Sequence, residues 1–587
     1  MQSSLNEKIE SMLELVEKPA RYIGGEVGSV VKKEYSCRTV LSYPDVYEIG
    51  TANQAVQVIY SLINETTGGW AERAFCPWTD AAKIMRETHL PLFSLESWQP
   101  VKAADLWGIT MQFELTYTNI LELLDLAGVP LHSRERTESD PIVFGGGPAA
   151  SNPHPMAPFF DFIIIGDGEL VMPAIIHTFE DNRGLSRNEM IGKIAGLEGI
   201  YLPASGRRAV RAVVPALSLS AAPLKPIVPV MAVHDRATLE IMRGCTRGCR
   251  FCLAGFWYRP VRERGRDDVC SAVTGLLAAT GYEEASLSSL STTDYSAIAG
   301  VLKTLAEERP GLTISLPSLR VDAAVFKLLG LIPARKGSIT FAPEAGSQRL
   351  RDLINKQVTA SDIEAALTEA FKLGYSTIKL YFMIGLPGET DADLRAIVDI
   401  AVAARGIGRR NAAAPGRAQI NVSISTFVPK PHTPFQWDGM NSRAELAKKQ
   451  KFLKTSMPRK QIRLSLHDIG PSLVEGAIAR GGDRTPDAIE TAWRAGARFD
   501  AWTEMFNQQA WDRGFAAISS NVAAEASRLF AENEALPWDD IDSRIDKQFL
   551  LAEKKKAAKA ELTLDCRWAD CQLCGVCEGE IDMRVGE

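Results

Sequence analysis

The chain has 587 residues, of which 46% are hydrophobic and 24% are charged, with a formal net charge of −6 and a pI near 5.9. This length is too great for one ordinary domain, and the balanced composition excludes a fibrous or largely disordered protein. The small negative charge does not indicate a nucleic-acid partner, although it does not exclude a local basic patch.

No secretion signal or membrane segment is evident in the sequence. Residues 1–16 lack a charged region followed by an apolar core, and no run of about 18 apolar residues occurs. We therefore expect a cytoplasmic protein without a membrane partner. The chain has ten cysteines, and seven of them fall in two tight clusters. That pattern indicates metal ligation in a reducing compartment and not a disulfide framework.

The first part of the chain predicts an α/β domain. Residues 1–35 are charged and predict a helical extension. Residues 36–205 alternate apolar strands with helical patterns, which predicts a doubly wound α/β domain. Glycine-rich turns at 145–148 and 166–169 follow two of these strands, at the edge where open parallel sheets bind ligands.

The second part predicts a partial barrel. Residues 206–233 are rich in proline and small residues and predict a linker. Residues 234–457 alternate short apolar strands with helical segments, which predicts a (β/α)6 arrangement. Six strands are expected, at 238–242, 284–287, 312–316, 338–341, 377–382 and 419–426. Residues 458–587 predict a mostly helical region that ends in a cysteine cluster.

Three cysteines follow the first expected barrel strand. Cys245, Cys249 and Cys252 lie within eight residues. Thiolates are the usual ligands of iron–sulfur clusters, and a complete protein shell needs four of them, so this loop leaves one iron open. An open iron can chelate the amino and carboxylate groups of S-adenosylmethionine (SAM), whose sulfonium bond an electron from the cluster then breaks. The alternatives are a zinc knuckle, for which no fourth ligand stands at a typical spacing, and three unligated thiols.

The Cys-x3-Cys-x2-Cys spacing, with an aromatic side chain at Phe251, resembles the signature of the radical SAM superfamily. The resemblance implies a [4Fe-4S] cluster, SAM as a cofactor that Phe251 helps to bind, and an electron donor such as flavodoxin or ferredoxin. It also implies contacts to SAM from residues at strand ends: Glu344 to its ribose or methionine part, Arg320 to its carboxylate, and Gly385 and Gly388 to its adenine. If they do not contact SAM, Glu344 is expected to be a surface carboxylate and Arg320 a residue with a structural role only. The Gly-Gly-Glu segment typical after the second strand is replaced at 288–295, which leaves open the groups that hold the methionine amine.

The N-terminal domain resembles the cobalamin-binding domain that precedes the barrel in one large radical SAM subgroup. The resemblance implies that its glycine-rich turns bind a corrin through Gly145, Gly146, Gly147, Gly166, Gly168 and Glu169. Where such domains ligate cobalt, a histidine stands in an Asp-x-His-x-x-Gly motif, and the matching residues here are Asp45, Tyr47 and Gly50. A phenol with a pKa near 10 is a poor ligand, so we expect any cobalamin to lack a protein histidine. The alternative is an α/β domain that has lost the corrin.

The C-terminus carries four more clustered cysteines. Cys566, Cys571, Cys574 and Cys577 offer enough thiolates for a second [4Fe-4S] cluster or for a zinc site. The crowded spacing resembles ferredoxin-like ligation, which favours iron–sulfur, while zinc and an unligated tail remain alternatives.

Taken whole, the chain resembles a bacterial branch of radical SAM proteins with an N-terminal cobalamin-binding-like domain and a C-terminal cysteine cluster. The leading hypothesis is a transferase that moves a methyl group from cobalamin to an unactivated carbon of an unknown substrate. One alternative is a cobalamin-free radical SAM enzyme that performs methylthiolation or rearrangement. Another is a non-catalytic metal protein that assists RNA or ribosome assembly, but a purely structural site would normally close its fourth coordination position.

Overall fold

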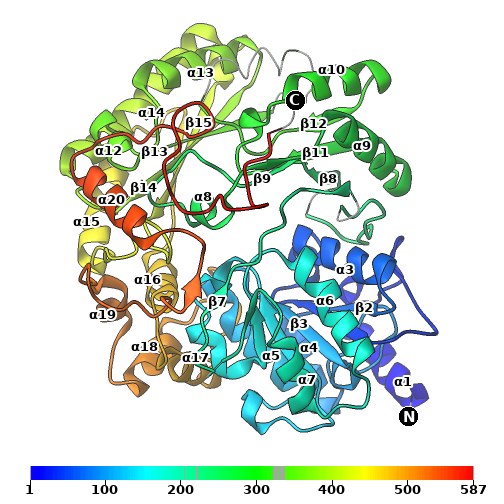
Figure 1. The fold of residues 1–587 in the computed structure, drawn as a ribbon. Coiled ribbons are helices and arrows are strands. Elements are labelled where there is room, and N and C mark those ends of the chain that lie inside the picture. The colour runs from blue at the N-terminus through cyan, green and yellow to red at the C-terminus, as the bar shows by residue number, and fades with distance from the viewer. Residues whose placement is uncertain are drawn as a thin grey trace.

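The computed structural model describes residues 2–203, 205–219, 222–233, 235–321, 330 and 337–585. These residues form an N-terminal α/β module, a barrel module and a set of C-terminal helices whose last segment returns to the barrel (Figure 1). Within this part of the chain, no helix is long and apolar enough to cross a membrane. The expected start of the barrel domain, residue 234, lies outside the described residues.

The N-terminal module is built on a six-stranded sheet of order β2-β1-β3-β4-β5-β6. The strands are β1 (Arg38–Tyr43), β2 (Trp70–Phe75), β3 (Leu106–Thr110), β4 (Ile142–Gly146), β5 (Phe162–Ile164) and β6 (Ile200–Tyr201). Among these described strands, only β6 pairs antiparallel with its neighbour. Every residue of β1 and β2 is buried, as in a parallel sheet that is covered on both faces. The strand order reverses between β1 and β3, and open α/β sheets bind ligands at such a switch point.

Helices cover the two faces of this sheet. They are α1 (Gln2–Leu13), α2 (Tyr47–Gly50), α3 (Gln54–Thr66), α4 (Thr79–Thr88), α5 (Tyr117–Ala127), α6 (Gly168–Asp181) and α7 (Arg187–Ile194). The side chain of Asn53 caps α3, and Ser186 and Glu189 form a capping box at the start of α7. Trp107 packs in the apolar core on one face, and Phe144 packs in the core on the other.

The expected linker at 206–233 has fixed contacts with the rest of the protein. Its β7 (Ala209–Val210) pairs with β17 (Ile541–Asp542) near the C-terminus. The backbone N–H of Ala212 donates to the carbonyl of Ile165 at 2.9 Å, and that of Val228 donates to the carbonyl of Val27 at 2.8 Å. The segment therefore covers the N-terminal module instead of spanning free space.

The described residues of the barrel module form seven parallel strands, in one three-stranded sheet of order β12-β11-β8 and one four-stranded sheet of order β13-β14-β15-β16. They are β8 (Ala237–Glu240), β11 (Glu284–Ser288), β12 (Thr313–Ser315), β13 (Ser338–Glu344), β14 (Thr377–Ile384), β15 (Gln419–Thr426) and β16 (Ile462–Leu466). Six of them coincide with the expected strands. The seventh, β16, lies in the region expected to be helical, so that expectation was wrong here. Its residues alternate apolar and polar, which is a strand pattern, but the run has only five residues and stands among helical segments.

Helices alternate with the strands of the barrel module along the chain. They are α8 (Leu253–Trp257), α9 (Arg266–Thr280), α10 (Ile298–Glu308), α12 (Gln348–Leu353), α13 (Ala360–Lys372), α14 (Asp391–Asn411) and α15 (Arg443–Ser456). Alternate residues of β14 and β15 are buried in the core that these helices share, and Leu380 and Val422 are examples. The residues between them are more accessible, and Tyr381 is 43% exposed. On these two described strands, the inner face is therefore not filled by apolar side chains.

The C-terminal helices connect the two modules. They are α16 (Ile469–Ala479), α17 (Thr485–Arg494), α18 (Gln508–Ala517) and α19 (Val522–Ser527). The indole of Trp493 on α17 donates to Glu122 on α5 at 3.0 Å. Asn152 in the N-terminal module donates to the carbonyl of Ala479 at the end of α16 at 3.0 Å. After these helices, α20 (Lys547–Ala558) packs on α12, and the final segment, red in Figure 1, crosses back over the barrel. The prediction of a mixed α/β chain with parallel sheets and a helical C-terminal region is confirmed.

A buried carboxyl group at this junction predicts a pH-dependent stability. Asp500 is 1% exposed and accepts hydrogen bonds from Thr118 at 2.6 Å and Trp511 at 2.9 Å. Burial raises the pKa of Asp500 to about 6, although both hydrogen bonds oppose the rise. Since an unfolded aspartate titrates near pH 3.9, the stability that this group contributes is fully present below about pH 4 and is lost as the pH rises through 6.

We therefore expect Asp500→Asn to remove part of the pH dependence of unfolding. Between about pH 4 and 7, the unfolding temperature of the parent should decline relative to that of the variant, as measured by differential scanning fluorimetry at several pH values. A difference between the two proteins that stays constant over this range would contradict the raised pKa.

Candidate active site

Cys245, Cys249 and Cys252 lie on the loop between β9 (Met242–Arg243) and α8. Burial and the charge of Cys249 raise the pKa of Cys245 to about 11 and that of Cys252 to about 12, so the three thiols lie close together. A β-carbon on Gly244 would come within 2.3 Å of the carbonyl oxygen of Pro260, so only glycine fits where the loop begins. A bound metal would supply the positive charge that ionises these thiols.

The three thiols suit a cluster better than a single ion. Among the described residues, no group of three or more histidine, cysteine, aspartate or glutamate side chains is arranged to hold one metal ion. An iron–sulfur cluster distributes its thiolate ligands over separate irons, so it does not require the sulfurs to converge on one point. Three cysteines on one short loop therefore fit three irons of a cube.

Hydrogen bonds between this loop and the fourth barrel repeat hold the loop in place. The amide of Asn355, which is fully buried, donates to the carbonyls of Arg247 and Gly248 at 3.2 Å each. The guanidinium of Arg250 donates to the carbonyl of Leu353 at 2.8 Å, at the C-terminal end of α12, where unpaired carbonyls favour a cation. The loop thus has a fixed position relative to the strand ends of the barrel.

Three residues that were expected to contact SAM lie around the cysteine loop. Phe251 packs in the same apolar cluster as Ala345 and Leu386, which follow β13 and β14. Gly385 and Gly388 have φ angles of +86° and +69°, which glycine adopts without steric cost. These residues meet at the end of the barrel where barrels place their active sites.

Glu344 and Arg320 also face this region. The carboxylate of Glu344 forms an ion pair with Lys356 at 3.3 Å, and its side chain is only 18% exposed, so it is not a surface carboxylate. The charge of Arg320 acts on Lys356, which places both cations near each other. The sequence did not mark Lys356, because a lysine after a short helix carries no motif of its own.

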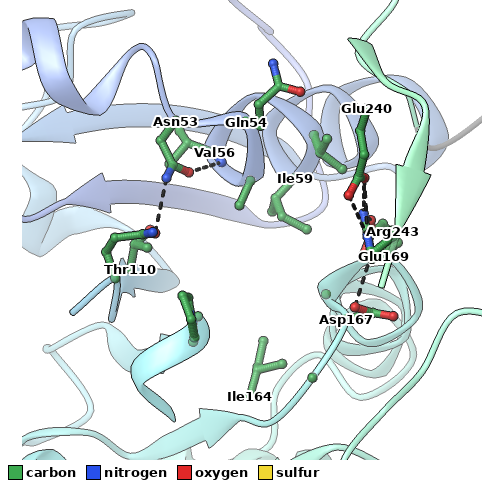
Figure 2. Close-up of a pocket in the computed structure, with 18 of the residues that line it drawn as sticks. Asn53, Gln54, Val56, Ile59, Thr110, Ile164, Asp167, Glu169, Glu240 and Arg243 are labelled. Carbon is green, nitrogen blue, oxygen red and sulfur yellow. Dashed lines mark hydrogen bonds and ion pairs between the residues drawn. The ribbon is translucent and has the colours of Figure 1, made fainter. Parts of the chain in front are cut away.

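A cavity of about 400 Å³ lies between the N-terminal module and the barrel (Figure 2). The ends of β1, β3, β4 and β5 and the start of α3 form one wall, and residues from β8, β9 and the end of β11 form the other. Four predicted glycines, Gly146, Gly147, Gly166 and Gly168, line it. The carboxyl ends of two parallel sheets therefore face one space, which is where both kinds of sheet bind ligands.

Arg243 joins the two modules at the wall of this cavity, as Figure 2 shows. Its guanidinium pairs with Asp167 at 3.1 Å and Glu169 at 2.6 Å, both from the N-terminal module, and with Glu240 of the barrel at 2.7 Å. Arg262 pairs with the other oxygen of Asp167 at 2.7 Å. Burial alone would raise the pKa of Asp167, but the two guanidinium groups hold it well below its usual range. Glu169 thus has a pairing role that its motif did not predict.

Other residues expected to bind a corrin do not line the cavity. Tyr47, on α2, is buried within the N-terminal module, where its hydroxyl donates to Glu26 at 2.9 Å. Asp45 accepts from the indole of Trp502 at 3.1 Å. Gly50 and Gly145 are likewise absent from the described lining. The side chains of Asp45 and Tyr47 thus contact other parts of the protein, and neither they nor Gly50 line the described cavity.

The C-terminal cysteines gather near one another. Burial and the charges of nearby Cys574 and Cys571 raise the pKa of Cys566. Burial and the charge of Cys574 likewise raise the pKa of Cys577. Cys571 and Cys577 are exposed, and the other two are half-buried. The four thiols share one short segment, and within the described residues their arrangement does not hold a single ion.

The tail that carries these cysteines is attached directly to the first cysteine loop. The hydroxyl of Thr246 donates to Asp565 at 2.6 Å, and Arg259 donates to Gln572 at 3.3 Å. Burial raises the pKa of both Cys245 and Cys566, and the charge of Arg259 opposes the rise in each. The two sets of cysteines therefore lie next to each other, although 313 residues separate Arg259 from Gln572 in the chain.

Comparison with known proteins identifies the family. The family model described as "Radical SAM proteins, N-terminal" matches residues 55–203, and that of the "Radical SAM superfamily" matches residues 239–401. Together these matches cover more than half of the chain. The chain belongs to the radical SAM superfamily. The prediction from the Cys245–Cys252 spacing is confirmed, and the [4Fe-4S] cluster and SAM follow as the cofactors of this radical SAM enzyme.

Relatives of this radical SAM protein cover different shares of the chain. "Uncharacterized protein MJ0966" from Methanocaldococcus jannaschii is 29% identical over 447 residues, which are 75% of this chain and 88% of the relative. A tRNA-2-methylthio-N(6)-dimethylallyladenosine synthase from Alteromonas mediterranea is 25% identical over 41% of this chain and 51% of its own. Among solved structures, the radical SAM methyltransferase TsrM from Kitasatospora setae, with cobalamin and a [4Fe-4S] cluster bound, has a TM-score of 0.47 at 16% identity, over 66% of this chain and 72% of that one.

The three-cysteine loop yields a direct prediction for this radical SAM enzyme. Replacement of Cys245, Cys249 or Cys252 by alanine should reduce formation of 5′-deoxyadenosine from SAM below detection, because each thiolate holds one iron. The measurement is chromatography of the products of anaerobically reconstituted protein after reduction. Cys270→Ala is the matched control, since Cys270 is a buried thiol on α9 away from the loop. SAM cleavage at the parent rate by each loop variant would show that this cluster is not the radical source.

Proposed function

We propose that this radical SAM enzyme transfers a methyl group to an unactivated carbon of its substrate and holds a cobalamin between its two modules. The observation that carries the proposal is the cavity onto which the strand ends of both sheets open. Arg243 lines this cavity, and Cys245 follows it by two residues. A ligand in the cavity would therefore lie beside the start of the cluster loop.

The lining of the cavity is compatible with a corrin, which is a flat ring fringed by amide groups. Gly146 and Gly168 leave the wall of the N-terminal module open because they have no side chain. The amides of Asn53 and Gln112 and the hydroxyl of Ser288 supply donors and acceptors for amides of a ligand. In the described part of the chain no histidine lines the cavity, which agrees with a corrin that takes no imidazole from the protein.

The residues of the chain have separate tasks in this proposal. When bound, the cluster and SAM supply the radical chemistry and cobalamin supplies the methyl group. Arg243 fixes the start of the cysteine loop against the module that holds the corrin. Trp257, which is 2% exposed, closes the barrel side of the cavity and helps to exclude water.

Corrin binding can be tested on the apoprotein. Titration with hydroxocobalamin, followed by its visible spectrum, should show binding at micromolar concentrations, and Gly146→Phe should abolish it by filling the cavity. Tyr47→Phe should retain binding, because Tyr47 lies outside the lining. Gly192→Phe is the matched control, since Gly192 has open space around it on an exposed part of α7. Absence of binding by the parent would leave a corrin-free module, and the methyl-transfer proposal would fail with it.

We further propose that the C-terminal cysteines hold a second [4Fe-4S] cluster, with zinc as the competing metal. The crowded spacing of four thiols favours iron–sulfur, and the exposed side of this site offers an approach for an electron donor such as flavodoxin or ferredoxin. Its attachment to the first cysteine loop supports transfer of electrons between the two sites.

Point variants test the second site better than truncation. The backbone N–H of Arg584 donates to the carbonyl of Val261 at 2.8 Å, so removal of residues 566–587 would also disturb the barrel. Cys571→Ser with Cys574→Ser should lower bound iron by about four atoms per chain and leave the first cluster intact, as measured by iron and zinc analysis of anaerobically purified protein. Cys270→Ser is the control. Loss of zinc with unchanged iron would overturn the preference for a cluster.

A second candidate function is methylthiolation without cobalamin. It is favoured by the similarity to the tRNA-2-methylthio-N(6)-dimethylallyladenosine synthase and by the second set of cysteines. A parent protein that binds no hydroxocobalamin but carries two clusters would favour this candidate over methyl transfer.

A further inference from the structure

Lys379 on β14 and Arg463 on β16 stand in one row across the inner face of the four-stranded sheet. In the register of this sheet, Lys379 pairs with Asn421 of β15, and Asn421 pairs with Arg463. Successive side chains of a strand point to opposite faces, and Leu380 and Val422, the next residues along, pack in the core with the helices. The row therefore faces the interior of the barrel. Since neighbouring strands lie about 4.8 Å apart, the Cα atoms of the two cations are about 10 Å apart, and their long side chains can reach one group between them.

Neither cation has a side-chain partner within the part of the chain that the structure describes. No ion pair or hydrogen bond joins the side chain of Lys379 or Arg463 to another described residue. Lys379 is half-buried and Arg463 is exposed. The Oδ1 atom of Asn421, which lies between them in the row, likewise has no hydrogen-bond partner there. The row thus has unused hydrogen-bonding capacity as well as charge.

The carboxylates that share the barrel wall are already paired. Among the described residues of β13–β16 that face inward, Glu344 is the only acid, and it pairs with Lys356 at 3.3 Å. On the other sheet, Glu240 and Glu284 pair with arginines at 2.7 and 3.4 Å. The row therefore carries two positive charges that no described carboxylate neutralises, and this arrangement attracts an anion.

Tyr381 stands between this row and the cysteine loop. It follows Lys379 by two residues on the same face of β14, and it is 43% exposed. Met383, two residues further along, packs against the same apolar cluster as Phe251 of the cysteine loop. At about 3.3 Å per residue, Lys379 lies about 13 Å along the strand from Met383. An exposed phenol ring at this height offers a flat surface to a ligand whose one end is held by the row.

We infer that the row of Lys379, Asn421 and Arg463 binds a phosphate monoester at one end of the substrate, while Tyr381 contacts a flat part of the same molecule. A terminal phosphate has enough acceptor oxygens for an ammonium, a guanidinium and an amide at once, and lysine and arginine are common phosphate-binding side chains. The row has only two cations and the whole chain is acidic, which favours a small substrate over a long polyanion.

This arrangement would hold the substrate by its unreactive end and direct the rest of it toward the cysteine loop, so that binding orients the carbon that reacts. The inference rests on the proposed function in one respect, because the phosphate would belong to the molecule that receives the methyl group. Phosphate binding itself requires no cobalamin.

The probe for this site is uridine 5′-monophosphate, which joins a phosphate to a flat ring and lacks the adenine of SAM. Binding of labelled uridine monophosphate and of uridine to the anaerobically reconstituted holoprotein is measured by equilibrium dialysis, with saturating SAM and without cobalamin. The parent should bind the monophosphate at least about 10-fold more tightly than uridine. Lys379→Met and Arg463→Met should each weaken binding of the monophosphate by about 10-fold and leave uridine within about twofold. Tyr381→Ala should weaken both ligands by a similar factor, about 5-fold or more.

Lys372→Met is the matched control, because Lys372 is an exposed lysine on α13 that pairs with Glu369 at 2.8 Å. Iron content and unfolding temperature report folding of each variant, and Lys379→Arg, which keeps the charge, should restore part of the affinity. If Lys379→Met loads no iron, Arg463→Met on the exposed edge strand decides the test.

Three results would overturn the inference: no binding of uridine monophosphate by the parent at millimolar concentrations, equal affinity of the parent for the two ligands, or parent affinity in both cation variants. Unchanged affinity of Tyr381→Ala would overturn the ring contact. Tighter binding of a uridine hexanucleotide than of the monophosphate would overturn the assignment to a small substrate. A failure to bind hydroxocobalamin would leave all of these results unaffected, and cleavage of SAM by the parent tests the family function separately.

Discussion

The contact between Arg243 and three carboxylates determines how the two modules face each other. The Arg243 side chain is only 14% exposed, so separating the modules would leave charged groups without partners in a shielded site, which is unfavourable. Asp167 and Glu169 come from the N-terminal module and Glu240 from the first strand of the barrel, so neither module can move without breaking a pair. The cavity and the start of the cysteine loop therefore keep a fixed relation, whatever ligand the cavity takes.

The tail supplies the second constraint on the same loop. Asp565 pairs with Arg247 at 3.2 Å, and Glu553 on α20 pairs with Arg250 at 3.1 Å. The loop is thus held from its first residues by the N-terminal module and along its length by the C-terminus. Because hydrogen bonds and ion pairs converge on it from three parts of the chain, the loop does not depend on bound iron alone for its position.

The sequence predicted those parts of the molecule that follow local rules. A buried parallel strand such as β5 appears in the sequence as a continuous apolar run, and the spacing of the three cysteines indicates their chemistry. Contacts between distant segments follow no such rule. Nothing in the Gly-Asp-Gly-Glu turn at 166–169 indicates an arginine more than seventy residues away as its partner. Tyr47 matched a ligand position in a motif, yet the helix that contains it turns the side chain into the core. Lys356 has no motif, and only the folded chain shows its ion pair with Glu344.

The open interior of the barrel explains why so many contacts come from outside it. A closed (β/α)8 barrel is stabilised by layers of branched side chains that fill its centre. Here the inner residues of β14 include Lys379 and Tyr381, and those of β15 include Ser423, so the interior adds little apolar burial. The apolar side chains of these strands instead pack outward against α13 and α14. A barrel whose interior stays free for SAM and a substrate lacks that central core. The N-terminal module, the C-terminal helices and the tail supply fixed contacts in its place.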